Sequence, residues 1–424
     1  MVISSLLTVS FRNLSDAAVN VAAKDVFFVG ENGQGKTNFL EALYYCAYAS
    51  SFRGINDSEI AQNGHKDFSA AITVSGMPVS PVNETIEPLS DPLEGNDNSS
   101  KIIIKFERGK KTVSIDGKKI EGRKELLSVV PCIAFCHEDM EFVAGSPERQ
   151  RWFFDQVLSL YDPVYLDDLR CYRRVLKSRN SVLRDYVRHK LDGSPDTLLD
   201  ALDQQCAVYG LRLMEKRETA ARLFSGIFEK LYREVSGIAG VCVQYLPSWK
   251  CNDEGGALDC MRRVHTPLFR ALKKGMYPET NTLPKQHTPS LQGGVVDLLR
   301  KRRPAELAAG ISLSGPHRDR YLFACGGVDF AAAASTGQRR LLALLLRVAQ
   351  ARRFSEMTGR NPILLLDDVL LEMDGEKRRR FVAALPDYDQ AFYTFLPEEP
   401  FQNYRKKDTL VYYVREGRME AAGS

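Results

Sequence analysis

The sequence predicts an α/β fold, with a mixed sheet and covering helices, into which a helical lobe is inserted. One observation is an apolar run at residues 26–29, typical of a buried strand, followed by helical spacing of apolar side chains at residues 38–45. A second is a helical pattern from residue 147 to about residue 303, in which no heptad repeat persists, so no long coiled coil is expected. A third is strand-like alternation at residues 69–75, 102–107 and 112–115.

Length and composition bound the class of protein. The chain has 424 residues, which exceeds one typical core and predicts two or three lobes. Its 44% hydrophobic and 26% charged residues are those of a globular chain rather than a disordered one. The formal charge of +4 is small, so an acidic partner would have to meet local basic clusters. No apolar run is long enough to cross a bilayer, and residues 1–9 read as a strand, so we expect a cytoplasmic protein with no membrane partner.

The cysteines do not indicate a disulfide framework or a metal centre. Nine cysteines are scattered singly along the chain, which favours reduced thiols. Cys132 and Cys136, followed by His137, lack the second pair at matching spacing that a zinc site requires. We therefore expect no zinc at these residues.

Shifts in pattern divide the chain into three segments. Residues 1–146 form the N-terminal part of the first lobe, residues 147–303 form the helical second lobe, and residues 304–424 form the C-terminal part of the first lobe. Residues 78–100 contain four prolines and several acidic residues but no lysine or arginine, which predicts a mobile acidic loop. Residues 251–294 are poorly patterned, and we expect loops there.

A glycine-rich loop lies between the first predicted strand and its helix. Residues 30–37 fit the phosphate-binding pattern G-x-x-x-x-G-K-[ST], in the strand and helix context that the pattern requires. Its glycines let backbone N–H groups turn towards a phosphate, and the helix adds the positive end of its dipole. Lys36 would reach the β- and γ-phosphates of ATP, and the Thr37 hydroxyl would ligate Mg²⁺. The predicted nucleotide-binding residues are Gly30, Glu31, Asn32, Gly33, Gln34, Gly35, Lys36, Thr37 and Asn38.

A second apolar strand, at residues 362–366, ends in two aspartates. P-loop ATPases place at this position the acidic residue that holds Mg²⁺ through water, which predicts that role for Asp367. Asp368 is placed to polarise an attacking water as a general base. Together with Lys36 these aspartates are the predicted catalytic residues, and Thr37 and Asp367 are the predicted metal ligands.

Ser335, Thr336, Gly337 and Gln338 directly precede a helix-like segment at residues 339–348. A hydroxyl residue and a glycine at a helix start form a second anion-binding element, because the first N–H groups are exposed and the dipole is favourable. In ATPases of the ABC type such an element meets the γ-phosphate bound by the other subunit, so that ATP joins two heads. The alternative, in which Ser335 is an ordinary N-cap, stays open.

Basic residues crowd the hairpin that follows the acidic loop. A solvated face and a surface for nucleic-acid phosphates explain this cluster equally well. Two further basic runs, at residues 173–174 and 300–303, are also candidate DNA contacts. The hairpin cluster comprises Lys101, Lys105, Arg108, Lys110, Lys111, Lys118, Lys119, Arg123 and Lys124.

Several sequence blocks follow one another over nearly the whole chain. They are residues 11–14 (FRNL), the phosphate loop with Glu41, residues 135–140 (FCHEDM) running into 145–147 (GSP), residues 172–176 (YRRVL) with Arg179 and Asn180, residues 314–319 (SGPHRD), residues 335–338 (STGQ), and residues 366–369 (LDDV) with Glu372 and Asp374. In content and order, this set of blocks resembles the RecF family.

The resemblance implies an ABC-type P-loop ATPase head with an inserted helical lobe. It implies an ATP-dependent DNA-binding protein of recombinational repair, which acts on single-stranded or gapped DNA, works with RecO and RecR and helps to install RecA. It assigns nucleotide and Mg²⁺ binding to Lys36, Thr37 and Asp367. It also implies an ATP-dependent homodimer, in which Ser335 and Gly337 form the signature that acts in trans and Asp374 lies in a loop that crosses the dimer.

The chain departs from the family at the flanks of its motifs. Arg320, Thr336, Leu371 and Met373 stand where the family usually has aspartate, glutamine, serine and leucine, respectively. Many ABC ATPases use a histidine after the second acidic strand, and Thr394 fills that slot here. We therefore expect weak, DNA-stimulated hydrolysis of ATP.

Two other function classes compete with this reading. One is a nucleotide-sensing scaffold that recruits partners with negligible turnover. The other is the ATPase subunit of an ABC transporter, which we expect to show a fuller glycine-rich signature, a glutamate after Asp367 and a histidine switch. The sequence has none of these three features.

Overall fold

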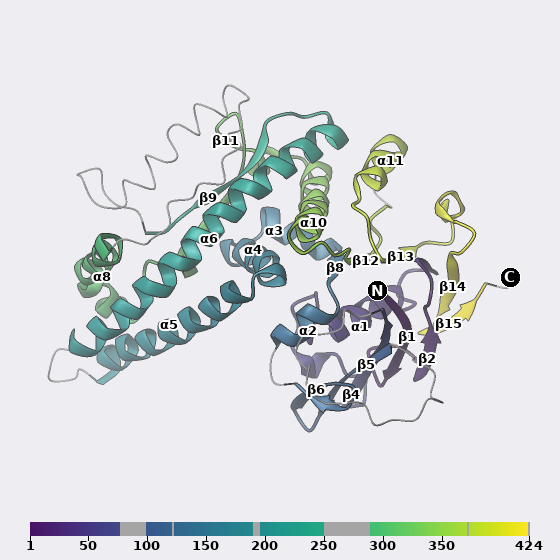
Figure 1. The fold of residues 1–424 in the computed structure, drawn as a ribbon, viewed down its shortest axis with the longest axis horizontal. Helices are drawn as coiled ribbons and strands as arrows, with labels where there is room; N and C mark the ends of the chain where they lie inside the picture. The colour runs from purple at the N-terminus through teal and green to yellow at the C-terminus, as the bar shows by residue number, and fades with distance from the viewer. Residues whose placement is uncertain (77–98, 121–122, 190–195, 250–288, 371–372, 423–424) are drawn as a thin grey trace, which may run out of the picture. The chain divides into compact units, whose positions relative to one another are not determined.

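The computed structural model describes residues 1–76, 99–120, 123–189, 196–249, 289–370 and 373–422. Contacts within the chain divide it into two compact units (Figure 1). Unit 1 comprises residues 1–144, 227–240 and 332–424, and unit 2 comprises residues 145–226 and 241–331. Residues 304–331, which the sequence pattern assigns to the first lobe, lie in unit 2 because their strand β10 (Arg320–Cys325) pairs with β9 (Val241–Leu246).

A six-stranded mixed sheet forms the centre of unit 1. Five of its strands run parallel, and β15 is antiparallel to β14 at one edge. Strands β3, β8, β12 and β13 are buried at every position, as expected for parallel strands covered on both faces. The two strands predicted before the glycine-rich loop and before the aspartates are thus confirmed. The strand order is β15 (Arg418–Ala421), β14 (Leu410–Arg415), β3 (Asp25–Val29), β13 (Gln390–Phe395), β12 (Ile363–Leu366) and β8 (Cys132–Phe135).

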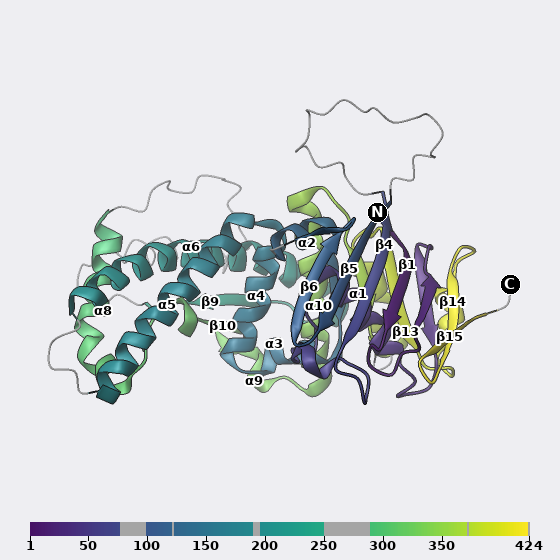
Figure 2. The same cartoon turned by 90° about the horizontal axis from the view of Figure 1, so that it is seen from below.

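The second sheet of unit 1 is antiparallel throughout. Figure 2 shows β6, β5, β4 and β1 side by side in this order. In β5 the buried Ile102 and Ile104 alternate with the exposed Lys101 and Lys105, so one face of the strand packs on the core and the other meets solvent. The strand order is β2 (Ala17–Asn20), β1 (Val2–Val9), β4 (Phe68–Ser75), β5 (Ser99–Glu107), β6 (Lys110–Ile115) and β7 (Lys118–Lys119).

Helix α1 (Lys36–Tyr48) joins the two sheets of unit 1. It contacts β4 and β5 of the antiparallel sheet as well as β8 and β13 of the mixed sheet, so nearly all its residues are buried. This position fixes the helix that follows the glycine-rich loop. The other helical elements of unit 1 are η1 (Asp57–Glu59), α2 (Arg123–Val129), η2 (His137–Met140), α3 (Glu141–Ala144), α10 (Thr336–Thr358), α11 (Gly375–Ala384) and η4 (Phe401–Tyr404).

Unit 2 is mainly helical, as predicted. Helices α5 and α6 lie side by side in Figure 1, and side chains from α4, α5 and α6 form a buried cluster that includes Leu158, Tyr165, Leu169 and Leu213. Helix α6 has 41 residues and continues into unit 1 after residue 226. The helical elements are α4 (Pro147–Tyr161), α5 (Pro163–His189), α6 (Asp196–Ser236), α8 (Pro289–Ala309), η3 (Pro316–Arg318) and, at the boundary with unit 1, α9 (Phe330–Ala333).

Two details of the helical prediction are wrong. Residues 241–246 form β9, which pairs with β10 and, through it, with β11 (Val328–Asp329) in a three-stranded sheet. Its alternating buried residues Val241, Val243 and Tyr245 are too few to stand out between longer helical patterns. Residues 289–294, expected to be loop, begin α8, because Val295 and Leu299 of that helix are buried and anchor its first turns.

Part of each predicted loop lies outside the described residues. This holds for residues 78–98 of the acidic loop and for residues 251–288 of the second predicted loop. Leu371 and Glu372, which follow the two aspartates, also lie outside the described residues. Residues 99–100 of the predicted loop belong to β5. Among the helices that the structure describes, none has both the length and the apolar content needed to cross a membrane.

Candidate functional site

The glycine-rich loop occupies residues 30–35, between the end of β3 and the start of α1. Gly33 and Gly35 have φ values of +80° and +111°, in the region where a side chain would strain the backbone. At Gly30, an added Cβ would lie 2.5 Å from the carbonyl oxygen of Val414 on the neighbouring strand. Glycine is therefore required at these positions by the path of the backbone.

Lys36 and the outer part of the loop form a cradle for an anion. The Lys36 side chain is buried, and its Nζ donates hydrogen bonds to the carbonyl oxygens of Gly30 at 2.7 Å and Glu31 at 3.1 Å. Glu31, Asn32 and Gly33 are exposed, so the loop is open on its outer side. A cation held by neutral carbonyls keeps most of its attraction for an anion.

Thr37 and the two aspartates meet at the edge where β3 and β12 end. The Thr37 hydroxyl donates to Asp367 Oδ1 at 2.9 Å, although 330 residues separate them in sequence. Thr394 at the end of β13 lies between the carboxylates: its Oγ1 is 3.1 Å from Asp367 Oδ1 and 2.9 Å from Asp368 Oδ1. One hydroxyl has a single proton to donate, so the two carboxylates compete for it.

The environment of Asp367 favours a proton on its carboxyl group. Burial and the neighbouring Asp368 raise the pKa of Asp367 from 3.8 to about 7, against the lowering effect of hydrogen bonds from Thr37 and Thr394. A divalent cation would reverse this balance, because it stabilises the charged carboxylate. Asp367 is therefore about half protonated near pH 7 and would become fully charged with a divalent cation beside it.

Several residues around the loop were not among the predicted ligands. The Asn13 side chain donates to the Gly33 carbonyl oxygen at 3.2 Å and accepts from Asn38 Nδ2 at 2.7 Å. Arg53 donates to the side chains of Asn38 and Glu41, both at 3.1 Å. Asn13 and Glu41 fall within the family-like blocks, whereas nothing in the spacing of Arg53 indicates that it lies here.

The predicted second anion-binding element is the start of α10. Ser335 caps this helix, because its Oγ accepts from the Gln338 N–H while Gln338 Oε1 accepts from the Ser335 N–H at 2.8 Å. Ser335, Thr336 and Gly337 are exposed. The N-cap alternative thus describes the local geometry, and the exposed helix start leaves an anion-binding role open as well.

Among the residues that the structure describes, neither the cysteines before His137 nor any acidic cluster forms a closed metal site. Burial raises the pKa of the Cys136 thiol well above its ordinary value, and the side chain lies at the start of η2 beside Asp139. Within the described part of the chain, no group of three or more His, Cys, Asp or Glu side chains could hold a metal ion. A cation at Thr37 and Asp367 would therefore complete its shell with oxygens from water or from a phosphate.

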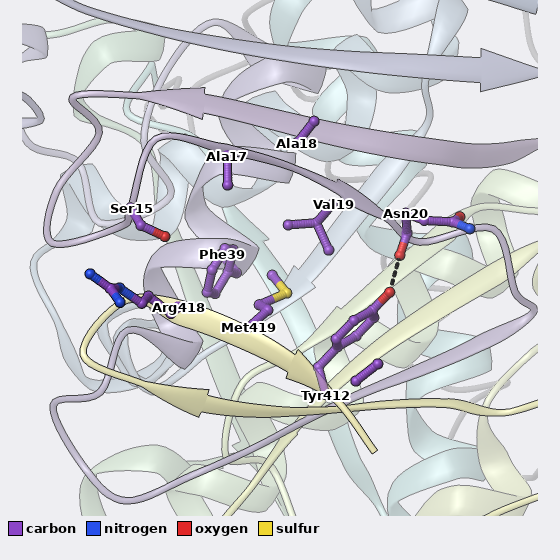
Figure 3. Close-up of a pocket in the computed structure, with 10 residues that line it drawn as sticks. Ser15, Ala17, Ala18, Val19, Asn20, Phe39, Tyr412, Arg418 and Met419 are labelled. Atoms are coloured by element: carbon purple, nitrogen blue, oxygen red, sulfur yellow. Dashed lines mark hydrogen bonds between the residues drawn. The ribbon is translucent and has the colours of Figure 1, made fainter. Parts of the chain in front are cut away.

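A cavity of about 430 Å³ is lined by residues other than those of this site (Figure 3). Its walls come from β2, α1, β14 and β15, and no residue of the glycine-rich loop lines it. In Figure 3, Ser15 and Arg418 lie at one end, and at the other Tyr412 donates to the carbonyl oxygen of Asn20. The predicted phosphate site therefore depends on the loop itself and not on this cavity.

Comparison with known proteins identifies the family. The chain matches the family model described as RecF/RecN/SMC N terminal domain over residues 2–419. It is 38% identical over 412 residues to the DNA replication and repair protein RecF of Treponema pallidum (strain Nichols), covering 97% of this chain and 99% of that protein. RecF of Halalkalibacterium halodurans is 27% identical over 424 residues, the full length of both chains.

The fold is similar to that of a solved structure described as the recombination mediator protein RecF-ATP in RecFOR pathway. The TM-score is 0.77 at 23% identity, and the match covers 100% of this chain and 98% of the other. This likeness agrees with the α/β head and inserted helical lobe described above. The chain belongs to the RecF family, within the larger family of RecF, RecN and SMC N-terminal domains.

Proposed function

We propose that the chain is an ATP-switched protein of DNA repair and replication-fork maintenance, which dimerises around ATP, binds single-stranded or gapped DNA and assists RecA loading with RecO and RecR. One observation carries the proposal: Thr37, Asp367, Asp368 and Thr394 converge beside an open anion cradle. The relatives named for DNA replication and repair, and the related structure named for ATP and the RecFOR pathway, support it. A cytoplasmic location follows from this function.

The nucleotide would be held by residues 30–38. Backbone N–H groups of the loop and Lys36 would bind the phosphates, and Thr37 with Asp367, partly through water, would hold Mg²⁺. The bound Mg²⁺ would neutralise charge on the phosphates. The positive φ values of Gly33 and Gly35 and the carbonyl-bonded Lys36 fit this assignment, because both prepare the loop for an anion.

Asp368 is the proposed general base. Its carboxylate is oriented by Thr394, and its own backbone N–H donates to the Thr394 hydroxyl at 2.7 Å. Thr394 is a neutral group with one proton, unlike the histidine that occupies this slot in many ABC ATPases. Weak hydrolysis follows, with Asp368 and Asp367 as catalytic groups and DNA as a stimulating ligand.

The start of α10 is the proposed contact with the second subunit. Ser335, Gly337 and the N–H groups of the first turn would meet the γ-phosphate bound by the partner copy. The Gln338 side chain supports this turn by accepting a hydrogen bond from the Ser335 N–H. A helix of 23 residues supplies the dipole, and its first residues are exposed. Asp374 caps α11 through the Lys377 N–H and stays exposed, as a residue of a loop crossing the dimer would.

The outer face of the antiparallel sheet is the best candidate for binding DNA. Lys101 and Lys105 are exposed on β5, and Lys119 extends the face on β7. Lys105 lies 3.9 Å from Glu107, but both side chains are exposed, so this ion pair offsets little of its charge. In contrast, Arg303 of the basic run at residues 300–303 is buried and pairs with three aspartates, so its charge is already offset. Lys111 is likewise tied to Asp57. The side chains of Arg123 and Lys124 lie outside the described residues.

The first experiment measures the mass of the protein in solution by light scattering, with and without ATP and Mg²⁺. We expect a dimer with ATP, and a monomer under all conditions for Ser335→Arg, which places a bulky cation at the helix start. Ser181→Arg, the same change on an exposed position of α5, is the control and should dimerise. A wild-type monomer throughout would contradict the ATP-switched dimer.

A second candidate function is a nucleotide-sensing scaffold. It is favoured by the neutral Thr394, which stands where many ABC ATPases use a histidine. Asp368→Asn separates the two functions: we expect turnover to fall at least about 100-fold, while the ATP-dependent dimer persists. DNA loading that proceeds unchanged in this variant would favour the scaffold.

The DNA surface is tested by the salt dependence of binding to a gapped duplex. Replacing Lys101 and Lys105 together with alanine should reduce the slope of log affinity against log salt by about two. Arg300→Ala, which removes an arginine already paired with Asp200, should leave the slope unchanged. An equal loss in both variants would contradict the assignment.

A further inference from the structure

Arg340 connects the start of α10 to the peptide that follows Asp368. It lies five residues after the capping Ser335, and its Nη2 donates a hydrogen bond to the Asp368 carbonyl oxygen at 3.0 Å. The bond is charge-assisted and half-buried, which makes it stronger than a bond between neutral groups at the surface. One side chain therefore joins two parts of the proposed ATPase machinery.

Asp368 has a backbone conformation that needs external support. Its φ is +47°, an uncommon value for any residue with a side chain, and it lies beyond the last residue of β12, Leu366. The Asp368 N–H and carboxylate are both bonded to the Thr394 hydroxyl. Its carbonyl is bonded to Arg340. Two side chains thus hold all three polar groups of this residue.

The geometry points to Arg340 as a positioning residue, which holds Asp368 in its left-handed conformation and thereby couples the start of α10 to the catalytic aspartate of the same chain. This inference rests on the proposed function, in which Asp368 is the general base and the start of α10 meets the nucleotide of a second copy.

Coupling between the two ATP sites of a dimer follows from this contact. A nucleotide held by the partner copy would act on Ser335 and Gly337, and any shift of the first turns of α10 would change the bond from Arg340 to Asp368. Sites are coupled when one element has contacts with both and its position changes with occupancy. Each copy would then sense the ATP of its partner through its own Arg340.

The test compares the full-length wild type with Arg340→Ala, Arg340→Lys and Arg352→Ala. Arg352 is the matched control, because it lies on the same helix and also donates to a backbone carbonyl of another element, that of Ala384. The first readout is hydrogen exchange of the Asp368 amide without nucleotide. The second is steady-state ATP turnover, separated into kcat and KM.

In Arg340→Ala we expect exchange of the Asp368 amide to become about tenfold faster, kcat to fall about tenfold and KM for ATP to change less than about twofold. Arg340→Lys should return both the exchange rate and kcat most of the way to their wild-type values, since the lysine ammonium can also donate to a carbonyl. Arg352→Ala should match the wild type in both readouts.

Unchanged exchange at Asp368 in Arg340→Ala would overturn the positioning role, and so would an equal increase in Arg352→Ala. Faster exchange with unchanged kcat would overturn the link to catalysis. A wild type without any turnover would refute the proposed ATPase activity, while the exchange measurement would still decide whether Arg340 holds Asp368.

Discussion

Two buried cations, one in each unit of the chain, have different kinds of partner. In unit 2, the guanidinium of Arg217 is 3% exposed and bonds to the carboxylates of Asp155 at 2.7 Å and Asp319 at 2.9 Å. In unit 1, the buried ammonium of Lys36 bonds to backbone carbonyls, and no carboxylate within the described residues lies at ion-pair distance from it. The Arg217 site therefore pairs charge with opposite charge, whereas the Lys36 site pairs charge with neutral dipoles. Elsewhere in unit 1 the buried Arg347 does have a carboxylate partner, Asp139 at 2.7 Å, so the difference belongs to the two sites and not to the whole units.

The difference separates charges that hold the fold from charges that bind the nucleotide or its metal ion in the proposed function. A buried cation between two carboxylates has no free capacity, and removing it leaves charges without compensation. A cation held by carbonyls, and an aspartate such as Asp367 held by hydroxyls, can exchange those neutral partners for a phosphate or a metal ion. Burial and charge alone do not distinguish the two regions, whereas the identity of the partners does.

The largest effect is expected in unit 2. Replacing Arg217 with alanine leaves the buried Asp319 without an ion-pair partner and leaves Asp155 with only the exposed Arg173, so the free energy of unfolding should fall by about 3–5 kcal/mol. Arg173→Ala removes another arginine that contacts Asp155, but its side chain is 62% exposed, and the loss should stay below about 1 kcal/mol. Urea denaturation of both variants checks this, and equal losses would remove the distinction drawn for unit 2.

In unit 1, replacing the buried Lys36 should weaken the binding of ATP and leave the free energy of unfolding nearly unchanged. Lys36→Ala should weaken ATP binding at least about 100-fold, because hydrogen bonds between charged groups contribute roughly 1.5–3 kcal/mol each. The free energy of unfolding should change by less than about 1 kcal/mol, since only bonds to carbonyls are lost. Calorimetric titration and urea denaturation measure the two quantities. A stability loss as large as that of Arg217→Ala would contradict the comparison.

One buried group in each unit should make the free energy of unfolding depend on pH, and the two dependences have opposite signs. In unit 2, burial lowers the pKa of His317 from 6.5 to about 4, so the folded state binds fewer protons than the unfolded state and stability rises with pH between these values. In unit 1, the pKa of Asp367 is raised from 3.8 to about 7, so the folded state binds more protons and stability falls with pH over that range.

Between pH 5 and pH 7, each group alone changes the free energy of unfolding by about 2 kcal/mol. The two changes have opposite signs and largely cancel in the wild type. His317→Gln should therefore become less stable as the pH rises from 5 to 7, relative to the wild type, and Asp367→Asn should become more stable. Urea denaturation without nucleotide at both pH values measures this. The same sign of change in both variants would refute the assignment.

Local patterns predicted the parts of the site that are continuous in sequence. The glycine-rich loop lies between an apolar run and a helical repeat, and the two aspartates follow a second apolar run, so each could be predicted from fewer than twenty residues. The order of the family-like blocks added the proposed roles of Ser335 and Gly337, which stay predictions. These signals sufficed for the fold class and for most of the candidate site.

Contacts between distant segments could not be predicted in this way. Thr37 meets Asp367 across 330 residues, and Arg340 reaches Asp368 from a helix whose own pattern shows only an amphipathic segment. Strand β9 was missed because six alternating residues carry little signal between long helices. Such features depend on how strands are ordered in a sheet, which the spacing of one chain does not reveal.

The smallest effect is expected for the Thr394 hydroxyl, the neutral partner of the two aspartates in unit 1. Thr394→Val keeps the shape of the side chain but removes the hydroxyl that lies between Asp367 and Asp368. The Asp368 carboxylate would lose its orienting donor, and we expect kcat to fall about tenfold, equivalent to about 1.4 kcal/mol. ATP affinity should change less than about threefold, because Lys36 and the loop are untouched. Thr394→Ser retains the hydroxyl and should turn over ATP like the wild type. If the valine and serine variants had the same kcat, the Thr394 hydroxyl would not orient Asp368. The rate of ATP turnover would then have to be set by the two carboxylates themselves rather than by their neutral partner.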